Sequence, residues 1–98
     1  MDNMKADLIT RFRNISEDGT GIEMVIWLVH ESVPPSEHKY KYRLVYIENG
    51  CRVVGFDNER GKGDHKHVGN VEMPYVFATP DRLVDDFIEE VERWKQGH

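Results

Sequence analysis

One polar segment of the sequence gathers the residue types that could do chemistry. Residues 57–67 read Asp-Asn-Glu-Arg-Gly-Lys-Gly-Asp-His-Lys-His, so acids, bases, histidines and glycines lie within one short stretch. The segment follows an expected strand and contains no side chain that we expect in a core. Because it adds little to folding through burial, we expect it to serve binding or catalysis. A solvated hairpin tip is the alternative.

Two histidines give this segment its clearest chemistry. His65 and His67 are two positions apart, and they share a face if the chain there is extended. Histidine titrates near neutral pH, so one ring can act as a general base while the other acts as a general acid. RNA cleavage needs such a pair, because one group takes the 2′-hydroxyl proton and another protonates the leaving oxygen. Surface imidazoles without a catalytic role are the alternative.

Charged neighbours in the same segment would complete such a site. Arg60, Lys62 and Lys66 could stabilise the negative charge that develops on a phosphate. Glu59 or Asp64 could orient a histidine or act as a base. The segment therefore offers both proton-transfer groups and groups that hold an anion.

Metal binding is the rival chemistry for the same residues. Asp64, His65 and His67 offer three possible ligands, but nothing in the sequence marks a fourth. We therefore expect no metal ion and no cofactor.

The glycines of the segment do not make a nucleotide P-loop. Gly61 and Gly63 permit unusual backbone angles and close approach of a ligand to the amides. However, five rather than four residues separate Gly55 from Gly61, and Gly63 stands where the motif requires Ser or Thr.

Aromatic and basic residues interleave shortly before the polar segment. Three tyrosines alternate with or follow three cations, at Lys39, Tyr40, Lys41, Tyr42, Arg43 and Tyr46. Aromatic rings can stack on bases while cations pair with phosphates, so Lys41, Tyr42 and Arg43 are further candidates for substrate binding. Packing of the tyrosines in a core is the alternative.

Charge is distributed unevenly along the chain. The net charge of −5 opposes nucleic-acid binding on average. The middle of the sequence is nevertheless locally basic, whereas the C-terminal segment is acidic. Such an asymmetry can concentrate an anionic ligand on one face, although mixed surface charge that only maintains solubility is the alternative.

Strands and one helix are expected to position these residues. Alternation and β-branched or aromatic content predict strands at 8–15, 22–29, 39–47, 51–56 and 73–79. Thr79-Pro80-Asp81 is a typical helix start, and an apolar stripe at helical spacing continues to Trp94. The sequence therefore predicts one α+β domain over residues 1–98, a small antiparallel meander of about four to five strands with a C-terminal helix packed on one face.

The register of the central hairpin follows from its turn. Asn49-Gly50 is the strongest short-range signal for a two-residue hairpin turn. A regular ladder would then pair Glu48 with Cys51, Tyr46 with Val53 and Tyr42 with Asp57. Both faces mix apolar and polar side chains, so the choice of core face stays open. The polar segment leaves from the end of the hairpin that lies away from the turn.

The cysteine count, the apolar runs and the N-terminal residues indicate the cellular compartment. Cys51 is the single cysteine, which rules out an internal disulfide and suits a reducing cytoplasm. No apolar run reaches the roughly 18–20 residues of a membrane span, and the N-terminus lacks the layout of a signal peptide. We therefore expect a cytoplasmic protein. The other histidines, His30, His38 and His98, have no sequence neighbours that suggest a catalytic or metal site.

Several motifs in order resemble the TumE family of toxin components. They are Lys-Tyr-Arg-Leu-Val-Tyr (41–46), Asn-Gly (49–50), the long motif from Arg52 to His67, Pro-Tyr-Val-Phe (74–77) and Asp86-Phe87, preceded by Glu-Met-Val-Ile-Trp (23–27). The resemblance covers about 22–91, and its central motif is far more specific than a short pattern. Phe56 departs from the family pattern, which often has Tyr there, and this puts any role for that hydroxyl in doubt.

The resemblance implies the toxin half of a two-gene toxin–antitoxin module, made beside a DNA-binding antitoxin. The resemblance implies that the functional residues are among those of the motif, namely Asp57, Asn58, Glu59, Arg60, Lys62, Asp64, His65 and His67. Our leading hypothesis is a small, metal-independent ribonuclease with acid–base histidines, neutralised by its cognate antitoxin. A non-catalytic module that occupies a nucleic-acid or protein target is the alternative, and a metal-dependent enzyme is a third hypothesis. The oligomeric state stays open.

Overall fold

The computed structural model describes residues 6–97 as one sheet and one helix. The elements are β1 (Asp7–Ile15), β2 (Gly21–Leu28), β3 (Tyr40–Glu48), β4 (Cys51–Asp57), β5 (His65–Val68), β6 (Val71–Pro74) and α1 (Pro80–Gly97). The first residues of the chain, on which the expectation of no signal peptide partly depends, lie outside the described part, and so does His98.

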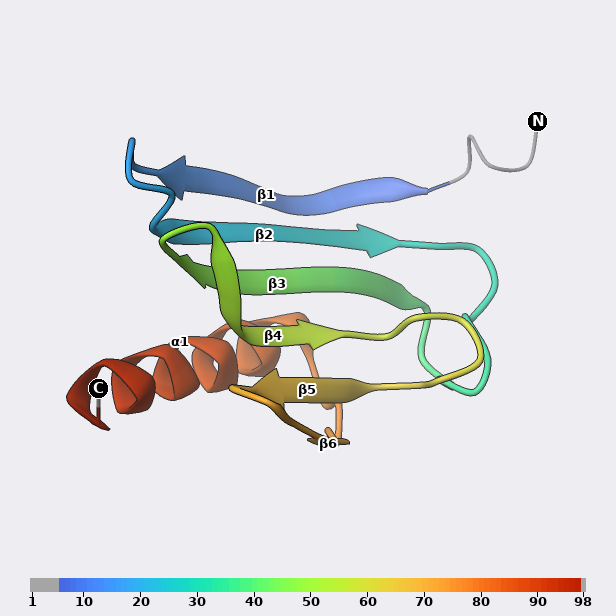
Figure 1. The fold of residues 1–98 in the computed structure, drawn as a ribbon. Helices are drawn as coiled ribbons and strands as arrows, with labels where there is room; N and C mark the ends of the chain where they lie inside the picture. The colour runs from blue at the N-terminus through green and yellow to red at the C-terminus, as the bar shows by residue number, and fades with distance from the viewer. Residues whose placement is uncertain (1–5, 98) are drawn as a thin grey trace.

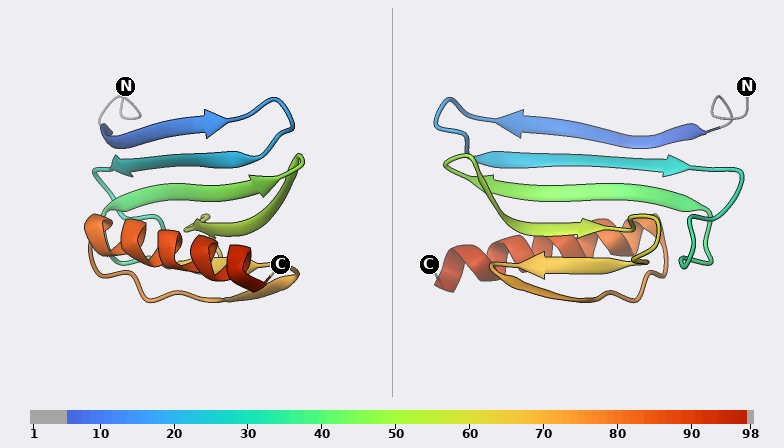
Figure 2. Two further views of the ribbon diagram at one scale, coloured as in Figure 1. Left: turned by 90° about the vertical axis from the view of Figure 1, so that its left-hand side faces the viewer. Right: turned by 45° about the vertical axis from the view of Figure 1, so that its right-hand side comes forward.

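The strands form an antiparallel meander in chain order, and α1 runs along one face of it (Figures 1 and 2). This arrangement confirms the α+β prediction. The sheet has six strands because residues 65–68, which contain the end of the polar segment, pair with both β4 and β6. Within the described residues, no helix is long and apolar enough to cross a membrane.

The last strand is shorter than the sequence predicts. β6 ends at Pro74, and residues 75–79 form no regular element before the helix. The chain must leave the sheet here to reach α1, and Tyr75 anchors the crossing by donating a hydrogen bond from its hydroxyl to Asp86 at 2.6 Å. The predicted N-cap is confirmed, because Thr79 Oγ1 accepts a hydrogen bond from the Arg82 N–H at 3.1 Å.

The predicted register of the central hairpin is wrong beyond its first pairs. Glu48 faces Cys51 as expected, but the ladder shifts between Tyr46 and Ile47, so that Tyr46 faces Val54 and Arg43 faces Asp57. Val53 is the additional residue of a β-bulge, which reverses the alternation of side chains in the rest of β4. The bulge turns the apolar Val54 and Phe56 toward the helix.

The core lies between α1 and one face of the sheet, which we call the helix face. Tyr42, Leu44 and Phe56 from the sheet and Leu83 and Phe87 from the helix are each at most 1% exposed. The Phe56 and Phe87 rings meet edge to face, with centroids 5.8 Å apart. Tyr42 therefore packs in the core, which was the alternative to a role in base stacking.

In the described part of the chain, no helix lies over the opposite face of the sheet, which we call the open face (Figure 2). Register and alternation assign to it the residues Glu23, Val25, Lys41, Arg43, Val45, Gly55, Asp57, His65, His67 and Glu72. Two cross-strand rows run over this face: Arg43, Asp57 and His65 form one, and Val45, Gly55, His67 and Glu72 form the other. The open face therefore carries polar and charged side chains from five neighbouring strands, β2 to β6.

Candidate functional site

Asn58 fixes the start of the polar segment. Its side chain is completely buried, accepts a hydrogen bond from the Tyr42 N–H at 3.0 Å and donates one to the Tyr40 carbonyl at 2.6 Å. The amide therefore takes over backbone pairing for β3 where β4 ends. The expectation that this segment contains no core residue is wrong, because Asn58 is buried and His65 is only 5% exposed.

The loop that follows is braced by the neighbouring loop between β2 and β3. The Gly61 N–H donates to the Pro34 carbonyl at 2.9 Å, and the Lys62 N–H donates to the Glu59 carbonyl at 3.0 Å. Gly63 has a φ of +78°, a left-handed angle that glycine adopts without strain. The polar segment is thus a pinned turn and not a solvated hairpin tip.

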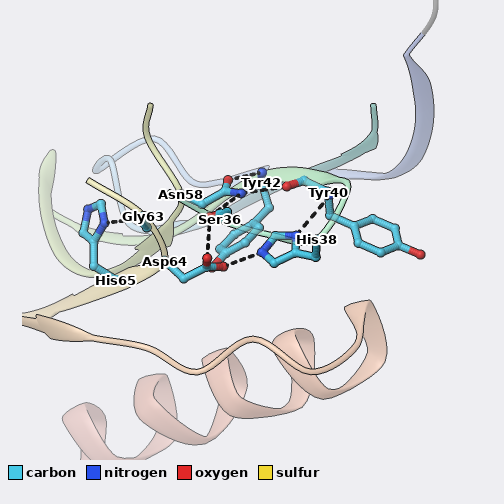
Figure 3. A network of polar contacts seen from close by, with 8 residues as sticks. All are labelled: Ser36, His38, Tyr40, Tyr42, Asn58, Gly63, Asp64 and His65. Carbon is cyan, nitrogen blue, oxygen red and sulfur yellow. Dashed lines mark hydrogen bonds and ion pairs between the residues drawn. The ribbon is translucent and has the colours of Figure 1, made fainter. Parts of the chain in front are cut away.

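Asp64 is the centre of a polar network on the helix face (Figure 3). Its carboxylate accepts hydrogen bonds from the Ser36 hydroxyl, from the Tyr42 hydroxyl at 2.7 Å and from His38 Nε2 at 2.7 Å. Burial alone would raise the pKa of Asp64, but these hydrogen bonds together hold that pKa below its usual value. Burial, and next the hydrogen bond to Asp64, raise the pKa of the Tyr42 hydroxyl.

His38 is a partner that the sequence did not reveal. Its Nδ1 accepts a hydrogen bond from the Tyr40 N–H at 3.1 Å, so its Nε2 carries the proton that it donates to Asp64. The ring also stacks on Phe77, with centroids 3.9 Å apart. Both nitrogens are occupied, which makes His38 a structural group. Asp64 lies 26 positions away in the sequence, and no local pattern links the two.

His65 and His67 lie on the open face, as an extended segment requires. Their rings meet edge to face, with centroids 5.0 Å apart. His65 points away from Asp64, its neighbour in sequence (Figure 3). Two carboxylates from other strands, and not Asp64, lie beside the histidines. Asp57 of β4 faces His65, and Glu72 of β6 faces His67. We call Asp57, His65, His67 and Glu72 the histidine–carboxylate cluster.

Short contacts define the cluster. His65 Nδ1 lies 2.9 Å from the Gly63 carbonyl oxygen. Its Nε2 lies 2.6 Å from Asp57 Oδ1 and 3.4 Å from Glu72 Oε2. His67 Nε2 lies 3.7 Å from the same Glu72 oxygen. Glu72 was not predicted, although the Gly69-Asn70 turn is a two-residue hairpin signal that places Glu72 opposite His67.

Three cations surround the cluster. Lys62 Nζ lies 3.9 Å from Glu72 Oε2, and Arg43 precedes Asp57 in its cross-strand row. The Arg52 side chain crosses Gly55, since a Cβ built there would lie 2.9 Å from Arg52 Cδ. Partial burial, and next the positive charge of Arg52, lower the pKa of His67.

A shallow hollow extends this basic surface toward β1. It has a volume of about 220 Å³, and Arg11, Arg13 and Arg43 contribute to its lining. Arg13 is partly neutralised by Glu23, whose carboxylate oxygen lies 3.4 Å from Arg13 Nε. Positive side chains therefore continue across the open face beyond the histidines.

Other candidates from the sequence lie elsewhere. Lys66 is on the helix face, where its Nζ is 2.6 Å from Glu90 and 5.7 Å from the centre of the Phe56 ring. Tyr42 and Asp64 are on the helix face too. Glu59 and Arg60 are exposed in the turn, and Lys41 is exposed on the open face opposite Trp27. The structure brings together five of the residues named from the sequence: Arg43, Asp57, Lys62, His65 and His67.

The fold and the cluster define a small α+β protein that presents histidines, carboxylates and cations on an open sheet face. The family model described as Toxin TumE matches residues 5–95, which is nearly the whole chain. The chain belongs to the TumE family of toxins, and the predicted resemblance is confirmed. A toxin family implies an antitoxin partner. No curated protein and no solved structure matches the chain.

Proposed function

We propose that this TumE-family chain is the toxin of a type II toxin–antitoxin module and that it cleaves RNA on the open face of its sheet. Family membership supports the toxin role. The observation that carries the chemistry is the pair of histidines beside two carboxylates, with Lys62, Arg43 and Arg52 around them. Histidines beside cations are suited to a substrate that needs proton transfer next to a phosphate.

The proposed reaction is an internal transesterification. His67, the more exposed ring, takes the proton from the ribose 2′-hydroxyl as the 2′-oxygen forms a bond to phosphorus. The bond from phosphorus to the 5′-oxygen breaks, and protonated His65 gives its proton to that leaving oxygen. The products are a 2′,3′-cyclic phosphate and a 5′-hydroxyl, so atoms and charges balance without a cofactor.

The surrounding charges would hold the substrate and tune the histidines. Lys62, Arg43 and Arg52 would stabilise the negative charge that increases on the phosphate oxygens. The Gly63 carbonyl, 2.9 Å from Nδ1, would keep the His65 ring oriented, and the negative charge of Asp57, whose Oδ1 lies 2.6 Å from Nε2, would favour the protonated ring. Arg11 and Arg13 at the neighbouring hollow would bind phosphates farther along the strand.

Induced expression of variants in a sensitive host tests the acid–base role. His67→Ala should abolish growth inhibition, because a general base contributes typically about 10²–10⁴-fold to rate. The exposed His30 provides a matched control, and His30→Ala should remain as toxic as the unaltered chain. Circular dichroism and thermal unfolding establish that both variants fold. A folded His67→Ala variant with full toxicity would mean that histidine catalysis is wrong, and it would favour the non-catalytic binding module.

A further inference from the structure

The ring of His65 has a defined hydrogen-bonding state at one nitrogen. The Gly63 carbonyl can only accept, so Nδ1, 2.9 Å away, carries a proton. In a neutral ring the lone pair is then on Nε2, which faces Asp57 Oδ1 at 2.6 Å and Glu72 Oε2 at 3.4 Å. A lone pair this close to two carboxylate oxygens is repulsive. A positive species at Nε2, either a proton or a metal ion, would relieve this repulsion.

The contact with Asp57 does not have the direction of a hydrogen bond. Asp57 Oδ1 is buried and has no hydrogen-bond partner among residues 6–97, although Nε2 lies only 2.6 Å away. A proton on Nε2 would thus leave the oxygen poorly paired, because hydrogen bonds weaken steeply when bent. A buried carboxylate oxygen without a donor is costly, so this position calls for a cation or for a water molecule held by one.

The spacing of the cluster fits the ligands of one small cation. His65, His67 and Glu72 each offer one ligand atom, and these atoms lie within 4.8 Å of one another. The separations of 3.4 Å and 3.7 Å from Glu72 Oε2 to the two Nε2 atoms are near the roughly 3.3–3.6 Å between two ligands of a tetrahedral Zn²⁺ with bonds of about 2.0–2.2 Å. The Nδ1–H to carbonyl bond of His65 is the outer support that metal-bound histidines commonly have.

We propose that His65, His67 and Glu72 bind a Zn²⁺ ion, with Asp57 accepting a hydrogen bond from water on the ion. Two imidazoles and one carboxylate suit Zn²⁺ and leave one position open. Mg²⁺ and Ca²⁺ prefer ligands that are all oxygen and fit this set poorly. This site differs from the ligand set suggested by sequence, because Asp64 is on the other face and Glu72 takes its place.

Nearby cations limit the affinity of this site. Lys62, at 3.9 Å from Glu72 Oε2, must release that carboxylate when the ion enters. Arg52 beside His67 and Arg43 beside Asp57 repel a second positive charge. The site is therefore suited to reversible binding of the ion and not to its permanent retention. Glu72, with a side chain 45% exposed, gives the ion a route from solvent.

Zn²⁺ binding at this site would regulate the toxin, and this inference rests on the proposed function. The ion occupies the Nε2 lone pairs that proton transfer to and from RNA requires. Zn²⁺ binding would therefore inhibit cleavage reversibly, and a chelator would restore it. The toxin would be active only in its metal-free form.

Direct metal binding by the purified full-length chain tests the site independently of activity. Zn²⁺ titrated against a chromophoric chelator should show one ion bound per chain, and Co²⁺ should give the visible absorption of a low-coordinate site with nitrogen ligands. Glu72→Gln should weaken the affinity at least about tenfold, as loss of a supporting group already costs 10–100-fold. His67→Ala should do the same, whereas the exposed controls Glu17→Gln and His30→Ala should leave it unchanged.

Absence of binding, or an affinity that neither Glu72→Gln nor His67→Ala alters, would overturn the site. The Co²⁺ spectrum of the unaltered chain decides the same question if a variant fails to fold. Cleavage of RNA with added Zn²⁺ tests the regulatory step: inhibition that a chelator reverses supports it, and unchanged cleavage by the Zn²⁺-loaded chain overturns it. Intact RNA with and without metal would contradict the proposed function, and the binding data would still decide the metal site.

Discussion

At the scale of the residue, alternation along β5 decides which groups act together. Asp64 and His65 are adjacent, yet Asp64 joins Ser36, His38 and Tyr42 on the helix face while His65 joins the open face (Figure 3). The alternation of an extended chain places His65 and His67 on one face, and this part of the site was predicted. The same alternation separates Asp64 from both histidines, although Asp64 was expected to act with them. The network around Asp64 was not, because its members are brought together only by tertiary packing.

The hydrogen bond between Tyr42 and Asp64 should contribute measurably to stability. Tyr42→Phe removes a donor to a carboxylate at 2.7 Å without changing the ring that packs in the core. We expect the free energy of unfolding to fall by about 1.5–3 kcal/mol in urea denaturation, the usual range for a hydrogen bond to a charged group. Tyr40→Phe, on the same strand, is the control and should change it little. Equal stability of the two variants would contradict the assigned network.

At the scale of the element, turns and helix caps were predictable and the bulge was not. Asn49-Gly50 and Thr79-Pro80 define their turn and cap through local chemistry alone. The additional residue Val53 has no local signature. It is favoured because it turns Val54 and Phe56 onto the helix face, a gain that depends on α1. Register errors of this kind move a whole strand segment to the wrong face.

The connection between β6 and α1 should make stability depend on pH through Asp86. Burial alone would raise the pKa of Asp86, but hydrogen bonds from Tyr75 and Arg82 hold it below the ordinary value of 3.8. A lowered pKa means that the stabilising contribution is present above the unfolded value and is lost as the pH falls toward the folded one. Asp86→Asn should therefore lower the free energy of unfolding by about 0.5–1.5 kcal/mol at neutral pH and by less in acid.

Urea unfolding of both chains at pH 7 and in acid measures this difference. Asp85→Asn is the matched control, since Asp85 is exposed one position earlier on α1. A penalty for Asp86→Asn that stays constant as the pH falls would show that the carboxylate is not ionised in the hydrogen-bonded pair.

At the scale of the whole molecule, the two faces of the sheet carry different kinds of side chain. The helix face holds the core, while the open face carries the cluster and a basic surface that continues to the hollow beside β1. The net charge of −5 therefore conceals a local surface suited to an anion. The acidic and basic asymmetry was visible in the sequence. Its assignment to faces required the register of every strand, and the cluster draws on β4, β5 and β6 together.

The histidine–carboxylate cluster is proposed to transesterify RNA. Its most direct test is to incubate total RNA with the purified, metal-free chain and to determine the chemistry of the new ends. We expect fragments with 2′,3′-cyclic phosphate and 5′-hydroxyl ends, formed by the unaltered chain and by His30→Ala but not by folded His67→Ala. Intact RNA, or fragments with 3′-hydroxyl and 5′-phosphate ends, would contradict it.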